Sequence, residues 1–569
     1  MVDLKSKPFN LNTEDVQWVN STLASLTFDE KVAQLFCLAT YFTDETNLKN
    51  TAQNIRPGGV MCRPMKAADV VEVVRTLQEN SRIPLLVAAN LERGGSGVAE
   101  EGTTLGSEML IAATGAAESA ERLGTVCGRE GAALGVNWAF SPIIDIDYNF
   151  RNPITNTRTF GSDPNWVRRL GLEFVKAVQK QGLAASIKHF PGDGMDERDQ
   201  HLVTSINSMT CGQWDETYGA AYKECIEAGA MTVMVGHIQH PAYVRKLNSK
   251  IADRDMLPAS LSYELCTKLL RDRLEFNGLI VTDATTMAGM TIAMPRWKAV
   301  PQTIAAGCDM FLFARSLEED IAFMRKGIED GIISERRLHD ALTRILGLKA
   351  ALGLHRKKAA GTLVPTLDKA MAVLNDGEHK TWAKECADKA ITLVKEEPGV
   401  LPLSPVRYKR VLFYPIEAAE GFAYSVRTGV VELFKQRLIQ EGFNIDQFVP
   451  TPGYEGRMES YMKIAGTYDL IVYLANMSTK SNQTTVRIEW AQPMGANVPT
   501  FMSVIPTIFI SVENPYHLVD VPRVRTFINT YSSTDTVLDA LVSKLMGRSP
   551  FKGKSPVDPF CGMWDAKLF

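Results

Sequence analysis

The chain has 569 residues, of which 45% are hydrophobic and 22% charged, with 41 glycines and 27 prolines. This length predicts more than one domain, unless one of them is a large α/β barrel of about 250 residues or more. The composition is close to the globular average and excludes a wholly disordered, collagenous or coiled-coil chain. The net charge is −3, so the charge balance does not favour a nucleic acid as partner.

We expect a cytoplasmic protein without a membrane partner. No run of about 18 apolar residues is present that would form a transmembrane helix. The first twenty residues carry charges where a signal peptide needs its apolar core. The nine cysteines are odd in number and widely spaced, without a C-x-x-C pair. This pattern predicts reduced thiols rather than a disulfide framework or a zinc site.

Short apolar runs alternate with amphipathic stretches through the first 350 residues. Eight of these runs are strand candidates, at 32–39, 58–62, 84–90, 136–146, 183–188, 231–237, 278–283 and 308–313. Strands buried on both faces and separated by helices predict a parallel sheet. Eight such units favour a (β/α)8 TIM-like barrel over an open sheet.

A helix at about 334–352 is expected to close the barrel, with Ser334 as N-cap and Gly353 as C-cap. The basic residues 355–358 that follow indicate a solvated linker. A second α/β pattern then predicts a three-layer α/β/α sandwich. Its strand candidates are 390–395, 410–415, 443–449, 470–474, 507–512 and 526–531, with helices such as 430–440 and 534–546. The expected domains are a barrel at 1–352, a linker at 353–381 and a sandwich at 382–569.

Ionisable side chains gather where the predicted barrel strands end, which is where barrel enzymes place their active sites. These residues are Asp145, Asp147, Lys188, His189, His237 and Asp283, joined by Asp193, Asp196, Asp199 and His201 from the loop after the fifth strand. Four of the eight histidines fall between positions 189 and 240. This concentration favours a functional cluster over scattered structural histidines.

Three kinds of chemistry fit these residues. A metal site would use His189, Asp193, Asp196, Asp199 and His201, although no compact H-x-x-x-H or H-E-x-x-H element is present. A phosphate-binding loop would use residues 93–97, which lack both the G-K-[ST] and the G-x-G-x-x-G spacing.

Covalent glycosyl transfer is the third kind, and it needs a carboxylate nucleophile and a separate proton donor. Asp283 ends a buried strand and suits the nucleophile. Asp199 and His201 lie two residues apart on a glycine-containing loop, which suits a histidine oriented by a carboxylate.

Several segments resemble glycoside hydrolase family 3, and more narrowly its β-N-acetylglucosaminidase branch. The resemblance is carried by Lys188-His189-Phe190-Pro191-Gly192, by Asp199-x-His201 and by residues 278–284. Segments 26–36, 152–161 and 234–242 extend it over the whole predicted barrel. The second domain resembles the sandwich that follows the barrel in two-domain members, and no catalytic residue is expected beyond position 350.

The resemblance implies a retaining mechanism. We expect neither a metal ion nor another cofactor. Asp283 would form a glycosyl-enzyme, and His201 paired with Asp199 would act as acid/base. Lys188, His189 and Arg158 match positions that hold sugar hydroxyls in the family. Asn90, His237 and Met287 are further candidate substrate-binding residues. Asn90 stands where the family commonly has an aspartate, and an amide bonds a hydroxyl without the charge.

We therefore expect an exo-acting β-N-acetylglucosaminidase that releases terminal GlcNAc from chitooligosaccharides or cell-wall fragments. The alternative is a β-N-acetylglucosaminide phosphorylase or transglycosylase, because a neutral histidine would not repel phosphate as a carboxylate does. A non-catalytic sugar-binding protein is a third hypothesis, and it predicts ligand binding without product.

Overall fold

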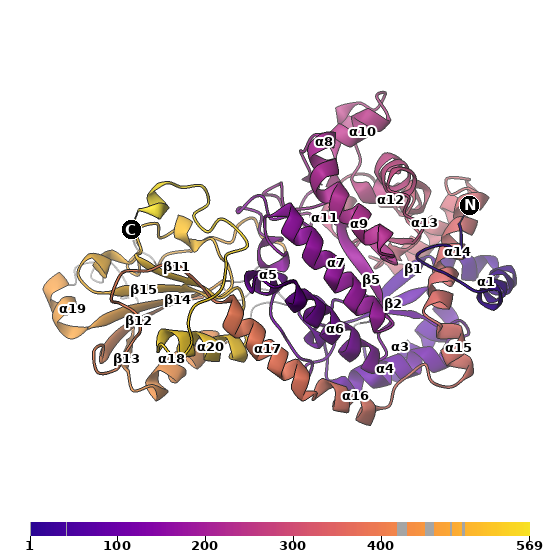
Figure 1. Cartoon of the computed structure of the whole chain (residues 1–569). Helices are drawn as coiled ribbons and strands as arrows, with labels where there is room; N and C mark the ends of the chain where they lie inside the picture. The colour runs from indigo at the N-terminus through magenta and orange to yellow at the C-terminus, as the bar shows by residue number, and fades with distance from the viewer. Residues whose placement is uncertain are drawn as a thin grey trace. The chain divides into compact units, whose positions relative to one another are not determined.

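The computed structural model describes residues 2–40, 42–417, 429–449, 460–477, 481–491 and 495–568. The chain forms two compact units (Figure 1). The first comprises Met1–Thr104, Ala120–Ile146 and Pro164–Lys380, and the second comprises Leu105–Ser119, Asp147–Asp163 and Thr381–Phe569. Each unit is described by itself below.

The first unit is a (β/α)8 barrel, as the sequence predicts. Its strands are β1 (Phe36–Thr40), β2 (Gly59–Cys62), β3 (Leu86–Ala89), β4 (Trp138–Ala139), β5 (Ala184–Phe190), β7 (Thr232–Val235), β9 (Leu279–Thr282) and β10 (Phe311–Leu312). They pair in parallel in the order β10-β1-β2-β3-β4-β5-β7-β9. A parallel bridge between Val281 and Met310 joins the two outer strands, so the sheet closes on itself.

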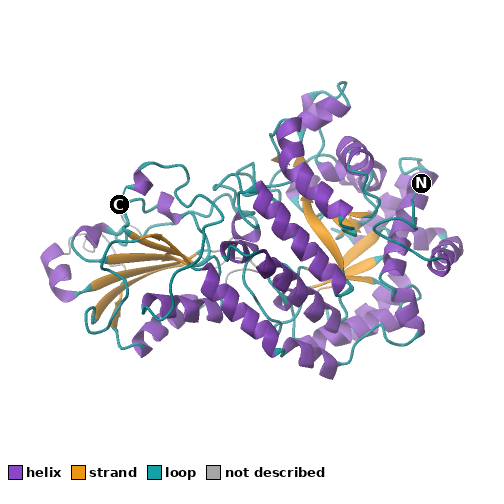
Figure 2. Ribbon diagram, viewed as in Figure 1, coloured by secondary structure: helices purple, strands orange, loops and turns teal. Residues whose placement is uncertain are grey.

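Helices surround this barrel (Figure 2). The longer ones are α1 (Thr13–Ser25), α4 (Ala67–Asn80), α6 (Ala117–Ala133), α7 (Pro164–Lys180), α12 (Arg296–Ala306), α13 (Leu317–Glu329) and α14 (Glu335–Ala351). Shorter ones are α2 (Phe28–Gln34), α3 (Glu45–Asn50), α8 (Cys211–Trp214), α9 (Ala220–Glu227), α10 (Pro241–Leu247), α11 (Ala288–Thr291) and the π-helix η7 (Glu264–Arg273). Because the strands carry mostly apolar side chains toward both the interior and these helices, all their residues are buried except Ala39 of β1, which is partly exposed.

Helix α14 ends the barrel as the sequence predicts. The Ser334 side chain accepts a hydrogen bond from the Arg337 backbone, and Gly353 has a φ of +64°. Leu338, Leu342 and Ile345 lie in the barrel core. These apolar residues recur at helical spacing, so they form the face that this helix buries.

The first strand candidate, 32–39, was wrong at its start. Residues Phe28–Gln34 form helix α2, because Thr27 and Glu30 make a reciprocal capping box at its N-terminus. The fourth candidate, 136–146, is regular strand over Trp138–Ala139 alone. The segment 353–381, expected as a linker, contains α15 (Leu354–Ala359) and α16 (Leu367–Leu374). Its residues from 377 onward form the start of α17 (Gly377–Ala390). The sandwich strand expected from 390 begins at Thr392, after α17 ends.

The second unit contains a six-stranded sheet in the order β11-β16-β15-β14-β12-β13. Its strands are β11 (Thr392–Lys395), β12 (Arg410–Glu417), β13 (Asn444–Gln447), β14 (Leu470–Asn476), β15 (Thr507–Ser511) and β16 (Thr526–Asn529). All pairs are parallel except β11 with β16. Helices α18 (Val430–Gln440) and α20 (Asp535–Leu545) lie on one face of the sheet (Figure 1).

The other face of this sheet carries a row of aromatic rings. Tyr414, Tyr473, Phe509 and Phe527 stack from strand to strand, with ring centroids 4.5–5.6 Å apart. Residues of helix α19 (Tyr461–Thr467) and of the turns η9 (Thr500–Ser503) and η10 (His517–Val519) belong to the same core. The sheet is thus the middle layer of three.

Two segments from the early part of the chain belong to the second unit. In Leu105–Ser119, which contains α5 (Glu108–Ala113), the Ser107 hydroxyl donates to the Tyr531 carbonyl at 2.8 Å. In Asp147–Asp163, the Asn156 amide donates to the Asn514 side chain at 3.2 Å. Both segments lie inside the range 1–352 that the sequence assigned to the barrel. The loop that follows β4 is therefore held by residues far along the chain.

Candidate functional site

Asp283 directly follows β9, at the carboxyl end of the barrel strands. Its backbone N–H donates to the Val235 carbonyl at 2.8 Å, which continues the β7–β9 pairing. The side chain is 14% exposed, and its Oδ2 lies 3.9 Å from Nε2 of His189. Asp283 is thus a rigidly held carboxylate with access to solvent.

Electrostatics keep Asp283 ionised. Burial by itself raises the pKa of this carboxyl, but His189, His237 and His201 together hold the pKa below its ordinary value. The Ala284 backbone N–H donates to Asp283 Oδ1 at 2.7 Å and acts in the same direction. An ionised carboxylate at a strand end is the state that a nucleophile requires.

His189 is held beside Asp283 by a second carboxylate, that of Asp145. Oδ2 of Asp145 accepts from His189 Nδ1 at 2.7 Å, and Oδ1 accepts from the His189 backbone at 3.0 Å. A carboxylate only accepts, so Nδ1 carries a proton and Nε2 is the atom that faces Asp283. The sequence placed Asp145 at a strand end but did not assign it to the site, because its contact with His189 has no signal in the sequence.

The Asp199–His201 pair is formed as the sequence predicts. Oδ1 of Asp199 accepts from His201 Nδ1 at 2.7 Å and from the His201 backbone at 2.8 Å. The His201 side chain is 27% exposed, whereas that of Asp199 is buried. Since Nδ1–H is engaged by the carboxylate, Nε2 is the atom that can exchange a proton with a bound molecule. His201 also lies close enough to Asp283 to lower the pKa of that carboxyl.

Lys188 and Glu92 form an ion pair in the barrel. Lys188 Nζ lies 2.7 Å from Glu92 Oε1, and both side chains are largely buried. Asn90 lies in the same turn after β3 and is half-buried. The pair places a cation and a carboxylate, both able to bond hydroxyl groups, at the strand ends.

His237 and Met287 act on the backbone around Asp283. The His237 ring bonds Ser260 Oγ at 2.8 Å through Nδ1 and the Ala284 carbonyl at 3.0 Å through Nε2. Burial lowers the pKa of His237. The Ala284 carbonyl can only accept, so Nε2 carries a proton toward it. Met287 is buried, and its backbone N–H also donates to Ala284. Since both His237 ring nitrogens bond the protein, this geometry favours a positioning role over direct contact with a sugar hydroxyl.

Arg158 lies in the second unit, at the end of the turn η3 (Asn156–Arg158). Its backbone N–H donates to the Thr155 carbonyl at 2.7 Å. The preceding residues of this loop bond Asp147 and Asn514. The role of Arg158 in holding a sugar stays a prediction.

The geometry does not favour the two other kinds of chemistry. Among the residues that the structure describes, no three His, Cys, Asp or Glu side chains are arranged to hold a metal ion. Asp196 instead pairs with Arg198, and Asp193 accepts from Gln200. In the glycine-rich loop, a Cβ at Gly95 would lie 2.0 Å from a carboxylate oxygen of Glu130. Close packing therefore accounts for this glycine without a phosphate.

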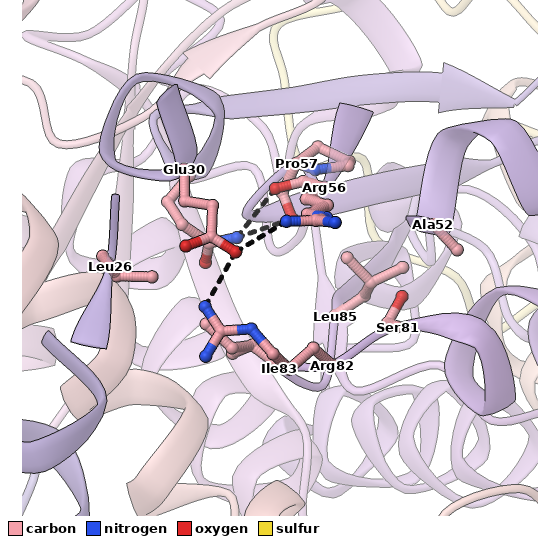
Figure 3. Close-up of a pocket in the computed structure, with 10 residues that line it drawn as sticks. Leu26, Glu30, Ala52, Arg56, Pro57, Ser81, Arg82, Ile83 and Leu85 are labelled. Carbon is pink, nitrogen blue, oxygen red and sulfur yellow. Dashed lines mark hydrogen bonds and ion pairs between the residues drawn. The ribbon is translucent and has the colours of Figure 1, made fainter. Parts of the chain in front are cut away.

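A small pocket lies at the opposite end of the barrel, where Pro57 precedes β2 and Leu85 precedes β3 (Figure 3). Glu30 accepts there from Arg56 at 2.9 Å and from Arg82 at 2.8 Å. These groups satisfy one another and lie away from the strand ends that carry Asp283. None of the described helices combines the length and apolar composition needed to cross a membrane.

Comparisons with known proteins identify the family. Residues 27–348 match the glycosyl hydrolase family 3 N terminal domain, and the chain belongs to this family of enzymes. It is 53% identical over 569 residues, covering all of both chains, to a protein of Cellulomonas fimi named beta-N-acetylglucosaminidase/beta-glucosidase.

Two solved structures extend the comparison. The structure of a protein named beta-glucoside phosphorylase BglX is 45% identical, with a TM-score of 0.93 over 99% of both chains. A family 3 beta-N-acetylglucosaminidase from Paenibacillus shares the fold at 24% identity, with a TM-score of 0.78 over 95% of this chain and all of the other.

Proposed function

We propose that the chain is an exo-acting retaining glycosidase that removes terminal β-linked N-acetylglucosamine through a glycosyl-enzyme on Asp283. The observation that carries the proposal is the Asp283 carboxylate, kept ionised at a strand end in the same unit as the Asp199–His201 pair. The name of the Cellulomonas fimi relative supports N-acetylglucosaminides and β-glucosides as substrates. Chitin- or peptidoglycan-derived fragments in the cytoplasm would supply such ends.

The two steps of the reaction use these residues in turn. In the first, a carboxylate oxygen of Asp283 bonds to the anomeric carbon while the bond to the leaving oxygen breaks and His201 Nε2 donates a proton to that oxygen. In the second, the neutral His201 takes a proton from the acceptor, whose oxygen displaces Asp283. Asp199 orients the ring and stabilises the imidazolium. Lys188 and His189 are proposed to bind sugar hydroxyls.

Phosphate is the second candidate for the acceptor. The 45% identical structure named a phosphorylase supports it. An uncharged imidazole, unlike a carboxylate acid/base, does not repel a phosphate dianion that approaches the anomeric carbon. With phosphate, one of its oxygens bonds to that carbon, the bond to Asp283 breaks, and the product is a sugar 1-phosphate.

Product analysis tests the proposal. A GlcNAc disaccharide and an N-acetylmuramic-acid-containing fragment are incubated with enzyme, with and without phosphate. Release of GlcNAc without phosphate supports hydrolysis, and GlcNAc 1-phosphate supports phosphorolysis. Asp283→Ala should abolish turnover of an aryl β-GlcNAc substrate. Normal turnover by this variant would overturn the proposal, and sugar binding without any product would favour the non-catalytic hypothesis.

A further inference from the structure

The loop that carries Asp199 and His201 is docked onto the segment that follows Asp283. The carbonyl of Gln200 accepts from the Gly289 backbone at 3.1 Å, and that of His201 accepts from Ala288 at 3.0 Å. The Thr204 hydroxyl donates to the Gly289 carbonyl at 2.8 Å. Three bonds thus join the loop to helix α11, which begins five residues after Asp283.

The Gln200 side chain makes a fourth hydrogen bond that connects the loop to the rest of the barrel. This side chain is buried, with 1% of its surface exposed. Its Nε2 lies 3.1 Å from Asp193 Oδ2, and its Oε1 accepts from the His237 backbone at 2.8 Å. A carboxylate accepts and a backbone N–H donates, so this environment requires one donor and one acceptor on the same side chain. An amide supplies both.

These contacts connect the loop to the surroundings of the nucleophile. The Asp193 backbone N–H donates at 2.8 Å to Asp145, the carboxylate that also holds His189 beside Asp283. On the other side, the His237 ring bonds the carbonyl of Ala284, the residue after Asp283. Gln200 therefore lies at the point where the two sets of contacts meet.

Gly289 permits the close approach of the loop. A Cβ at this position would lie 2.5 Å from the Gln200 carbonyl oxygen, 3.0 Å from the His237 Cβ and 3.2 Å from the Val203 carbonyl oxygen. The nearest of these atoms belongs to the backbone of the loop. A larger residue would therefore displace the loop from helix α11.

We propose that Gln200 is a positioning residue that holds the Asp199–His201 pair over Asp283 by bridging Asp193 and the His237 backbone. The inference rests on the proposed function of that pair. Gln200 is the buried residue between Asp199 and His201 in the sequence. Displacement of the loop would move the proton donor, His201, away from the leaving oxygen. A displacement of about 1 Å is enough to lower a rate strongly.

The substitution Gln200→Glu tests the bridge with almost no change of shape. It keeps the acceptor toward His237 and places a carboxylate against Asp193. We expect kcat/KM for phenyl β-GlcNAc, which has a poor leaving group, to fall about 10- to 100-fold at pH 7.5, a partial loss of the roughly 100- to 10,000-fold that general acid catalysis contributes. The 3,4-dinitrophenyl glycoside needs little proton donation, and its kcat/KM should change less than about threefold.

Two further measurements separate positioning from general damage. Protonation of the introduced glutamate restores a donor, so the ratio of variant to wild-type kcat/KM for the phenyl substrate should rise as the pH falls from 7.5 to 5.5. In the double variant Gln200→Glu/Asp193→Asn, donor and acceptor are exchanged. The asparagine can donate to the glutamate and still accept from Gly194. Activity on the phenyl substrate should return to within about threefold of wild type.

Gln179 provides a matched control. Its side chain donates to the Gly229 carbonyl and accepts from the Met231 backbone, both at 2.9 Å, before strand β7 rather than after it. Gln179→Glu makes the same chemical change at the other end of the strand and should leave the phenyl-to-dinitrophenyl ratio unchanged. Gly289→Ala should reproduce the selective loss without altering Gln200.

The outcomes distinguish this proposal from the proposed function. His201→Ala is measured in parallel, and a selective loss on the phenyl substrate supports its role as acid. If His201→Ala lacks that selectivity, the proposed function fails. If His201→Ala is selective but Gln200→Glu is unchanged, loses both substrates equally or is not restored by Asp193→Asn, the positioning role of Gln200 is overturned.

Discussion

The carboxylate of Asp145 holds His189 at two points, through the ring nitrogen at 2.7 Å and through the backbone N–H at 3.0 Å. Asp199 holds His201 in the same two ways, at 2.7 and 2.8 Å. The site thus contains two similar carboxylate–histidine pairs. The first faces the proposed nucleophile, and the second lies on the loop after β5, where the His201 side chain is more exposed than that of His189.

The two pairs should differ in their response to the leaving group. Asp199→Asn should lower kcat/KM for phenyl β-GlcNAc about 100-fold and that for the 3,4-dinitrophenyl glycoside much less, because proton donation alone is impaired. Asp145→Asn removes the acceptor for His189 and should lower both by a similar factor of about 10 to 100. Steady-state kinetics with both substrates check this. An equal selectivity of the two variants would contradict the division of roles.

Asn90 offers a test of substrate affinity. Asn90→Asp introduces the charge of the aspartate that the family resemblance places at this position, and hydrogen bonds to ionised acceptors are about twice as strong as neutral ones. We expect KM for an aryl β-GlcNAc substrate to fall about five- to tenfold with kcat nearly unchanged. A contact that is equally strong in the ground state and the transition state changes KM and leaves kcat unchanged. An unchanged or increased KM would contradict a contact between residue 90 and the sugar.

Lys349 makes barrel stability depend on pH. It is fully buried, its Nζ donates to Gln34 at 2.8 Å, and burial lowers the pKa of the amine to about 7. Between about pH 7 and its ordinary value of 10.5, the unfolded chain binds a proton that the folded chain does not, so stability rises with pH. Below pH 7 the folded barrel bears the full cost of the buried charge.

Lys349→Met should remove this dependence. The variant should be more stable than the wild type, and the difference in their free energies of unfolding should be largest at pH 6, up to about 5 kcal/mol. This difference should shrink as the pH rises toward 9. Urea unfolding at several pH values measures it. Lys326→Met, at an exposed position paired with Asp330, should leave the free energy of unfolding nearly unchanged at every pH. A pH-independent difference for Lys349→Met would refute the assignment.

Asp147 gives the second unit the opposite dependence. Burial raises the pKa of Asp147 to about 6, although hydrogen bonds from Thr155, Tyr516 and the Asn156 backbone act to lower it. Its contribution to stability is therefore present below the ordinary value of 3.8 and is lost as the pH rises through 6. The Tyr516 hydroxyl donates to this carboxylate at 2.5 Å.

Tyr516→Phe removes a hydrogen-bond donor that stabilises the ionised carboxylate of Asp147. The pKa of Asp147 should rise further, and the variant should be destabilised more at pH 8, by about 1.5–3 kcal/mol, than at pH 5. Chemical unfolding of the full chain at both pH values checks this. Equal destabilisation at the two pH values would indicate that Asp147 does not titrate as described.

Sequence patterns predicted the strands because each is an apolar run bounded by turn residues. They failed at residues 32–34, where the local capping box of Thr27 and Glu30 favours helix over the apolar pattern. The position of Asp283 at a strand end, and of Asp199 and His201 on the loop after β5, followed from barrel architecture. The bonds of Asp145 with Asp193, of Gln200 with His237 and of Ser260 with His237 join residues 23 to 48 positions apart. A polar side chain in a loop carries no sequence signal for such distant partners.

The most direct test of the central claim is the covalent intermediate itself. The enzyme is incubated with a fluorinated GlcNAc fluoride, whose ring fluorine slows the second step so that the glycosyl-enzyme accumulates, and the adduct is located by peptide mass spectrometry. The account predicts one sugar per chain, attached to Asp283, with turnover restored as the adduct is released to an acceptor. An adduct on another carboxylate such as Asp145, or turnover without any adduct at Asp283, would contradict it.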